Sequence, residues 1–117
     1  MGGTVTEAEL DSAIRKLCEL YRFRRYHTYR SRRSPAGFPD LVLVKPPRVL
    51  FVELKSDDGR TTREQDAWLD DLSRCPGIER YLWKPQDLER AAAILAGNPL
   101  AIGLDKSSRT ELGRARR

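Results

Sequence analysis

Two short apolar runs, separated by one turn-forming interruption, constrain the fold more than any other feature of the chain. Residues 41–44 read LVLV and residues 49–54 read VLFVEL, with Lys-Pro-Pro-Arg between them. Runs of this length that are rich in β-branched, aromatic and leucine residues predict an antiparallel hairpin. If residues 45–48 form the loop, Val44 pairs with Val49. In every pair further from the turn, the two residue numbers then add up to the same value, the index sum of the hairpin.

Charged residues interrupt these runs near one end of the predicted hairpin. Asp40 precedes the first run, and Glu53 and Lys55 lie near the end of the second. The register above pairs Asp40 with Glu53, which places their Cβ atoms roughly 4.5 to 5.5 Å apart on one face of the sheet. The two-residue period of a strand puts Lys55 on the same face, about 7 Å along the strand from Glu53. A β-bulge or another loop length would shift this register.

The two facing carboxylates predict a divalent-cation site. Like charges repel at such a position, and converging oxygen ligands with an open outer side suit Mg²⁺ or Mn²⁺, which keep several waters. A cation held by Asp40, Glu53 and the Leu54 backbone carbonyl can bind a phosphodiester oxygen and lower the pKa of a bound water, which Lys55 can orient or help deprotonate. The structural alternative is that Asp40 caps a strand while Glu53 and Lys55 form an exposed pair.

Basic residues are concentrated in one segment and at the C-terminal end. The net charge of +5 favours a polyanionic partner, and residues 22–33, RFRRYHTYRSRR, contain no acid. The alternative for this segment is a solvated helix end and loop. Residues 103–117 are also basic and lack apolar periodicity, which predicts a disordered tail. The predicted phosphate contacts are Arg24, Arg25, Arg30, Arg32 and Arg33.

Apolar periodicity and capping residues predict the remaining elements. Thr6 is a typical N-cap, and the apolar residues behind it recur at helical spacing, which predicts a first helix over residues 7–21. Residues 26–29 predict a short strand, followed by a loop over residues 30–38.

In the second half of the chain, Thr61 or Thr62 caps a helix that ends before Pro76, residues 78–83 predict a strand, and residues 85–97 predict a last helix. The element order is then helix, three strands, helix, strand, helix. This order predicts an α/β fold with a mixed sheet of about four strands flanked by helices. We expect one domain over residues 1–102, with Phe51, Trp68 and Trp83 in its core.

The cysteine and histidine content excludes several classes of protein. Cys18 and Cys75 lie far apart, and the single His27 cannot complete a zinc site with them. We therefore expect reduced thiols, no small-molecule cofactor and a cytoplasmic location. Neither an apolar signal segment nor a membrane span is indicated.

The residues Gly37-Phe38-Pro39-Asp40, then Glu53-Leu54-Lys55, then Gln65 resemble the pattern of the PD-(D/E)XK nuclease superfamily. The run GFPDLVLV…RVLFVELKSDDGRTTREQDAWLDDL is most similar to the VRR-NUC branch, especially its small stand-alone phage and bacterial members. The resemblance covers residues 6–88. The Pro-Asp to Glu-x-Lys spacing is a loose motif alone, but with the glycine and the glutamine it is fairly specific.

The resemblance implies a restriction-endonuclease-like core that cleaves DNA with a divalent metal, with ligands at Asp40 and Glu53 and a catalytic lysine at Lys55. It also implies branched or flapped DNA as a substrate class, a homodimer with two active sites and, for a phage-encoded chain, a place in the host cytoplasm. An acidic residue of the first helix should approach the metal. Glu9 is the best match and Glu7 the second candidate, but Thr6 and Glu9 also form a capping-box pattern.

Gln65 is open to the same two interpretations. Thr62 and Gln65 also have capping-box spacing, yet Gln65 falls on the inner stripe of its helix with Trp68 and Leu69. The inward position suits a residue that positions Lys55 or a water molecule.

Two rival functions remain open from the sequence. A non-catalytic DNA-binding module could use the same arginines, but a pure binder gains little from facing carboxylates beside a polyanion. An RNA-directed nuclease would carry the same acidic and basic residues.

Overall fold

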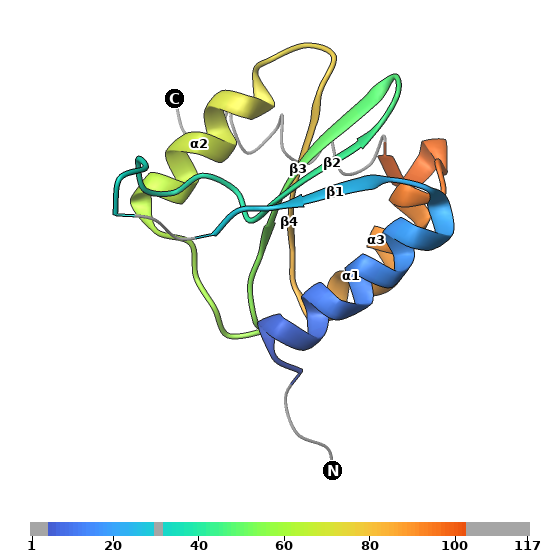
Figure 1. The fold of residues 1–117 in the computed structure, drawn as a ribbon, viewed down its shortest axis with the longest axis horizontal. Coiled ribbons are helices and arrows are strands. Elements are labelled where there is room, and N and C mark those ends of the chain that lie inside the picture. The colour runs from blue at the N-terminus through green and yellow to red at the C-terminus, as the bar shows by residue number, and fades with distance from the viewer. Residues whose placement is uncertain (1–4, 30–31, 103–117) are drawn as a thin grey trace.

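The computed structural model describes residues 5–29 and 32–102, which form a four-stranded mixed sheet flanked by helices (Figure 1). This confirms the predicted α/β class. Arg30 and the predicted tail over residues 103–117 lie outside the described residues. The elements are α1 (Glu7–Tyr21), β1 (Arg24–His27), β2 (Leu41–Lys45), β3 (Arg48–Leu54), α2 (Arg63–Ser73), β4 (Glu79–Trp83), the 3₁₀ turn η1 (Pro85–Asp87) and α3 (Leu88–Leu95).

The strands lie in the order β1-β2-β3-β4. The first three are antiparallel neighbours, and β4 is parallel to β3. A parallel pair cannot be joined by a tight turn, and α2 provides the crossover between β3 and β4. This connection places the start of α2 just after the end of β3, where the charged residues of the hairpin lie.

The β2–β3 hairpin has the predicted register and a tighter turn than predicted. Val44 is opposite Val49, as expected, but Lys45 is also paired with Arg48, so Pro46 and Pro47 alone make the turn. The predicted four-residue loop was wrong. Shortening the loop by one residue on each side leaves the index sum unchanged, so the register of every later pair is preserved.

The first strand begins earlier than predicted. It spans Arg24–His27 instead of residues 26–29, because α1 ends abruptly at Arg22, which has a left-handed conformation with φ of 66°. Phe23 is buried directly after this reversal, and pairing starts with Arg24 opposite Val44. Two consecutive arginines are compatible with a strand here because their side chains point to opposite faces.

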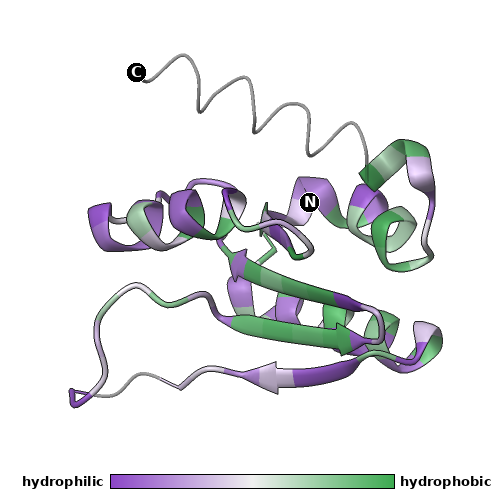
Figure 2. Cartoon of the chain, turned by 90° about the horizontal axis from the view of Figure 1, so that it is seen from above, coloured by the Kyte–Doolittle hydropathy of each residue, from purple (hydrophilic) through white to green (hydrophobic). Residues whose placement is uncertain are grey.

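The sheet has one fully covered face and one partly covered face. Helices α1 and α3 pack side by side on the first face (Figure 1), and helix α2 lies over the second face at one end. The hydropathy colouring in Figure 2 shows the apolar central strands between polar outer segments. The buried core under α1 and α3 comprises Leu10, Ile14, Cys18, Phe23, Leu41, Leu43, Leu50, Val52, Leu54, Tyr81, Trp83, Ala91, Ile94 and Leu95.

The predicted core residues divide between the two faces. Trp83 is fully buried under α1 and α3, as predicted. Phe51 and Trp68 are only half-buried, on the α2 face. Phe38 lies between them in edge-to-face contact with both, and its ring centroid is 6.0 Å from that of Phe51 and 5.0 Å from that of Trp68. The aromatic contacts therefore tie the segment before β2 to both the sheet and α2.

Cys18 is buried, Cys75 is exposed, and both are free thiols. Within residues 5–29 and 32–102, no helix is long and apolar enough to cross a lipid bilayer.

Candidate active site

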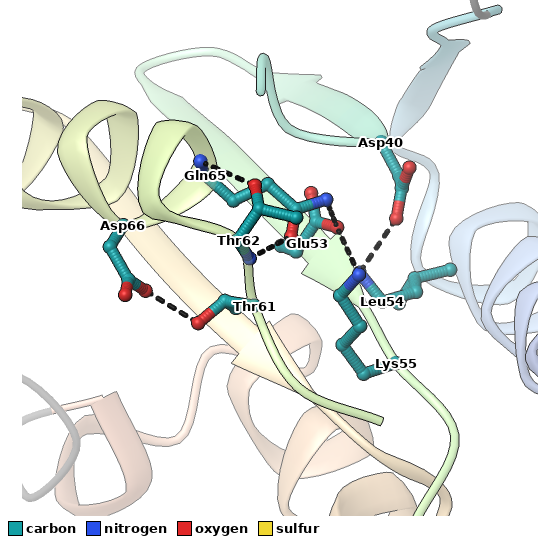
Figure 3. A network of polar contacts seen from close by, with 8 residues as sticks. All are labelled: Asp40, Glu53, Leu54, Lys55, Thr61, Thr62, Gln65 and Asp66. Carbon is teal, nitrogen blue, oxygen red and sulfur yellow. Dashed lines mark hydrogen bonds and ion pairs between the residues drawn. The ribbon is translucent and has the colours of Figure 1, made fainter. Parts of the chain in front are cut away.

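The open end of the hairpin brings Asp40 and Glu53 together. The pairing of β2 with β3 ends at Leu41 opposite Val52, and one further step places Asp40 opposite Glu53 on the α2 face. The Leu54 amide donates a hydrogen bond of 2.9 Å to Asp40 Oδ2, which holds the Asp40 side chain across the end of β3 (Figure 3). The predicted meeting of two carboxylates is therefore present.

Glu53 is the most deeply buried acidic residue of the described chain, with 1% of its surface exposed. Its Oε2 atom accepts a hydrogen bond of 2.7 Å from Gln65 Nε2 and lies 3.7 Å from Lys55 Nζ (Figure 3). Its Oε1 atom is buried and has no hydrogen-bond partner among the described residues. One oxygen is thus fixed by neighbours, and the other is left for a ligand.

Helix α2 begins with a capping box that also delivers Gln65 to the site. Thr62, rather than Thr61, is the N-cap. Its Oγ1 accepts a hydrogen bond from the backbone N–H of Gln65, and its own backbone N–H donates to the side-chain oxygen Gln65 Oε1 at 2.8 Å. The Nε2 group of the same side chain donates to Glu53. The capping interpretation of Gln65 is therefore confirmed, and the same side chain also reaches the site, where its nitrogen contacts Glu53 instead of the predicted Lys55 or water.

Burial raises the pKa of the Glu53 carboxyl from 4.5 to about 8. This net shift also includes a rise caused by the adjacent Asp40 charge and a smaller opposing effect of Lys55. In the absence of a cation, the Glu53 carboxyl is therefore expected to retain its proton at neutral pH.

This shift predicts how stability depends on pH when divalent cations are absent. The unfolded chain releases the Glu53 proton near pH 4.5, and the folded chain releases it only near pH 8. The contribution of Glu53 to the free energy of unfolding is therefore complete below pH 4.5 and is lost as the pH rises through 8. At about 1.4 kcal/mol per pKa unit, the loss is on the order of a few kcal/mol. Denaturant unfolding in EDTA, between about pH 5 and pH 8, should show this fall in the native protein and a weaker fall in Glu53→Gln. Equal slopes in the two proteins would contradict it.

The donor set is compatible with Mg²⁺ or Mn²⁺. Asp40 and Glu53 offer two carboxylates, and the unpaired Glu53 Oε1 is the kind of buried oxygen that a cation satisfies. No group of three or more His, Cys, Asp and Glu side chains suited to a metal is found in the described residues. Mg²⁺ often binds through one or two carboxylates and fills its remaining positions with waters and phosphate oxygens. The role of the Leu54 carbonyl stays a prediction.

Glu9 does not join this pair. Its Oε1 accepts a hydrogen bond of 2.9 Å from the Thr6 amide, while its own amide donates to Thr6 Oγ1. The capping interpretation is therefore the one that the structure shows. A contact between the metal and Glu9 or Glu7 has no support in the described residues, in which no group of three acids is gathered.

The predicted DNA-contacting arginines occupy different environments. Arg24 is exposed and, through its register with Val44, lies on the same sheet face as Glu53. Arg25 points to the opposite face, where its Nη2 contacts both Asp11 carboxylate oxygens at 2.7 and 2.8 Å. Arg25 therefore anchors β1 to α1, and this ion pair competes with the predicted phosphate contact. Arg32 and Arg33 are exposed in the loop before β2.

Thr28 and Asp11 make contacts that were not predicted from the sequence. The Thr28 amide donates to the Asp40 carbonyl at 2.7 Å, which extends the β1–β2 pairing by one step to the acidic pair. A correct start for β1 would have indicated this neighbour. Nothing in the sequence indicated that Asp11 would pair with Arg25, since an acid on an amphipathic helix is usually solvated.

In a comparison with protein families, a family model described as the VRR-NUC domain matches residues 4–84 of the chain. Comparison with curated proteins and with solved structures found no match. The matched region contains the sheet, α1 and α2, and every residue of the site described above.

Proposed function

The chain belongs to the VRR-NUC domain family of nuclease-type domains, and from this premise we propose that it is a divalent-metal-dependent DNA endonuclease. The observation that supports this best is the constellation of Asp40, Glu53 and Lys55 at one end of the sheet. Glu53 Oε2 is fixed by Gln65 and lies near Lys55, and Oε1 is free for a ligand.

In this proposal Asp40 and Glu53 hold the cation through carboxylate oxygens. The bound cation would supply charge stabilisation at phosphorus and a lowered pKa for the attacking water. Lys55, whose Nζ lies 3.7 Å from Glu53 Oε2, would orient that water or, as a neutral amine, accept its proton. Gln65 is a positioning residue, since its hydrogen bond sets the rotation of the Glu53 carboxylate.

The proposed nuclease domain extends beyond the family match. Ala91, Ile94 and Leu95 of α3 belong to the same buried core as α1 and the sheet, although the match ends at residue 84. We therefore assign α3 to the domain and place its limits at residues 1–102, with residues 103–117 as a basic tail.

The direct test is digestion of labelled linear, flapped and four-way DNA in Mg²⁺, Mn²⁺ or EDTA. The proposal expects cleavage with a metal and none in EDTA. A native protein that leaves every substrate intact with both metals overturns it. The panel also tests the extension to branched or flapped DNA, and sedimentation of the native protein tests the proposed homodimer.

The strongest rival is a non-catalytic DNA-binding module. It expects DNA binding that survives Lys55→Ala and no cleavage under any condition. Digestion of labelled RNA beside the DNA separates an RNA-directed nuclease from the proposed one.

Arg24 and Arg25 form a matched pair for testing where DNA lies. Arg24→Gln should weaken DNA binding severalfold and reduce its dependence on salt, because an exposed arginine on the site face releases counterions at a phosphate. Arg25→Gln should instead lower the melting temperature, because it leaves Asp11 without its bidentate partner. Salt-dependent binding titrations and thermal unfolding of both variants check this. Equal loss of DNA affinity in both would contradict the assignment of faces.

A further inference from the structure

Thr28 lies beside the acidic pair, immediately after β1. Its amide donates to the Asp40 carbonyl at 2.7 Å, and this bond continues the register in which His27 is opposite Leu41. Residues opposite each other in an antiparallel pair share a face, so Thr28, Asp40 and Glu53 form one row across three strands. The row lies on the α2 face, where the proposed chemistry takes place.

The hydroxyl of Thr28 is buried and unpaired. Its Oγ1 atom has no hydrogen-bond partner among the described residues, and the same holds for Glu53 Oε1 in the same row. A buried polar group without a partner costs about 1 to 3 kcal/mol, so such atoms usually meet a water, an ion or a ligand. The two unpaired oxygens flank Asp40, which makes one shared ligand a better explanation than two unrelated defects.

We propose that the Thr28 hydroxyl is a positioning group of the metal centre and hydrogen-bonds a water in the hydration shell of the cation. This inference rests on the proposed function, because it requires the cation between Asp40 and Glu53. Mg²⁺ held by two carboxylates keeps several waters, and a hydroxyl can accept from such a water as well as donate. Groups that orient metal ligands in this way typically change metal affinity or activity by about 10- to 100-fold when they are removed.

Thr28→Val and Thr28→Ser separate the hydroxyl from the rest of the side chain. Valine keeps the branched shape and removes the oxygen, while serine keeps the oxygen. Calorimetric titration with Mn²⁺ should show binding by Thr28→Val weakened by about 10- to 100-fold, and binding by Thr28→Ser close to the native value. In EDTA, Thr28→Val should melt at the same temperature as the native protein or higher, since it loses an unpaired buried hydroxyl.

The outcomes distinguish this inference from the proposed function. Native protein that neither binds Mn²⁺ nor cleaves DNA overturns both. Native protein that binds and cleaves, together with a Thr28→Val variant of unchanged Mn²⁺ affinity, overturns the role of Thr28 alone. A Thr28→Val variant that loses Mn²⁺ affinity only because it melts at a much lower temperature in EDTA also overturns it.

Discussion

Glu53→Gln should reduce DNA cleavage by about 10³-fold or more while leaving DNA binding and the fold intact. The amide removes the negative charge that a divalent cation requires, yet it has nearly the same shape as the carboxyl that it replaces. Because burial and the Asp40 charge make the Glu53 carboxylate unfavourable, the variant should be more stable than the native protein in EDTA near pH 8. A variant that is inactive and more stable is difficult to explain by misfolding.

The matched control is Glu79→Gln, which changes the other buried glutamate of the described residues. Glu79 accepts hydrogen bonds from Arg48 Nε and Nη2 at 2.8 Å and from the Tyr81 hydroxyl at 2.6 Å, on the α1 and α3 face of the sheet. Its loss should lower stability and leave the cleavage rate per folded molecule near the native value. Multiple-turnover cleavage and denaturant unfolding of both variants make the comparison. Full cleavage by Glu53→Gln would remove Glu53 from the catalytic centre.

Gly37→Ala should cost more stability than an ordinary change of glycine to alanine and should also reduce cleavage. Gly37 has a φ of +94°, and a Cβ atom there would lie 2.5 Å from the carbonyl carbon of Glu64 in the first turn of α2. The left-handed backbone costs an alanine about 1 to 2 kcal/mol, and the overlap with a backbone atom adds about 1 to 3 kcal/mol. Relief of the overlap would move the segment that carries Asp40 away from the helix that carries Gln65.

Gly77→Ala is the control for the backbone contribution. Gly77 has a φ of +86°, but a Cβ atom there would have no neighbour within 4 Å. This variant should lose only about 1 to 2 kcal/mol and keep its activity. Denaturant unfolding gives the two free energies, and cleavage assays give the rates. Equal stability losses would show that the approach of Gly37 to α2 contributes nothing beyond its backbone conformation.

The acidic pair could be predicted from the sequence because it depends on local pairing. The index sum of a hairpin is set by its turn, and the apolar alternation permits only one face for each residue. For that reason the error in loop length at Lys45 and Arg48 did not move Asp40 away from Glu53. Capping patterns were local in the same way, so Thr6 was identified as an N-cap, and the second cap was narrowed to Thr61 or Thr62, of which the structure shows Thr62.

The local sequence did not indicate features that depend on partners distant in the chain. Arg25 belongs to a basic segment that suggests phosphate contacts, yet its bidentate ion pair with Asp11 depends on how α1 packs on β1. Glu9 satisfied both a cap and a family pattern, and only the folded helix shows which bond it makes. The start of β1 depended on the left-handed conformation of Arg22. Arginine rarely adopts this conformation, so the sequence does not indicate it.

The sequence alone determined the class of fold, the hairpin and the approach of Asp40 to Glu53, because turn chemistry and apolar periodicity act between near neighbours. The tertiary structure alone decided which oxygen of Glu53 stays unpaired, that Gln65 reaches Glu53 while it caps α2, and that Thr28 joins the row. These features depend on the packing of α2 and β1 against the hairpin. Such packing is set by many weak contacts between distant residues, and no short stretch of sequence contains them.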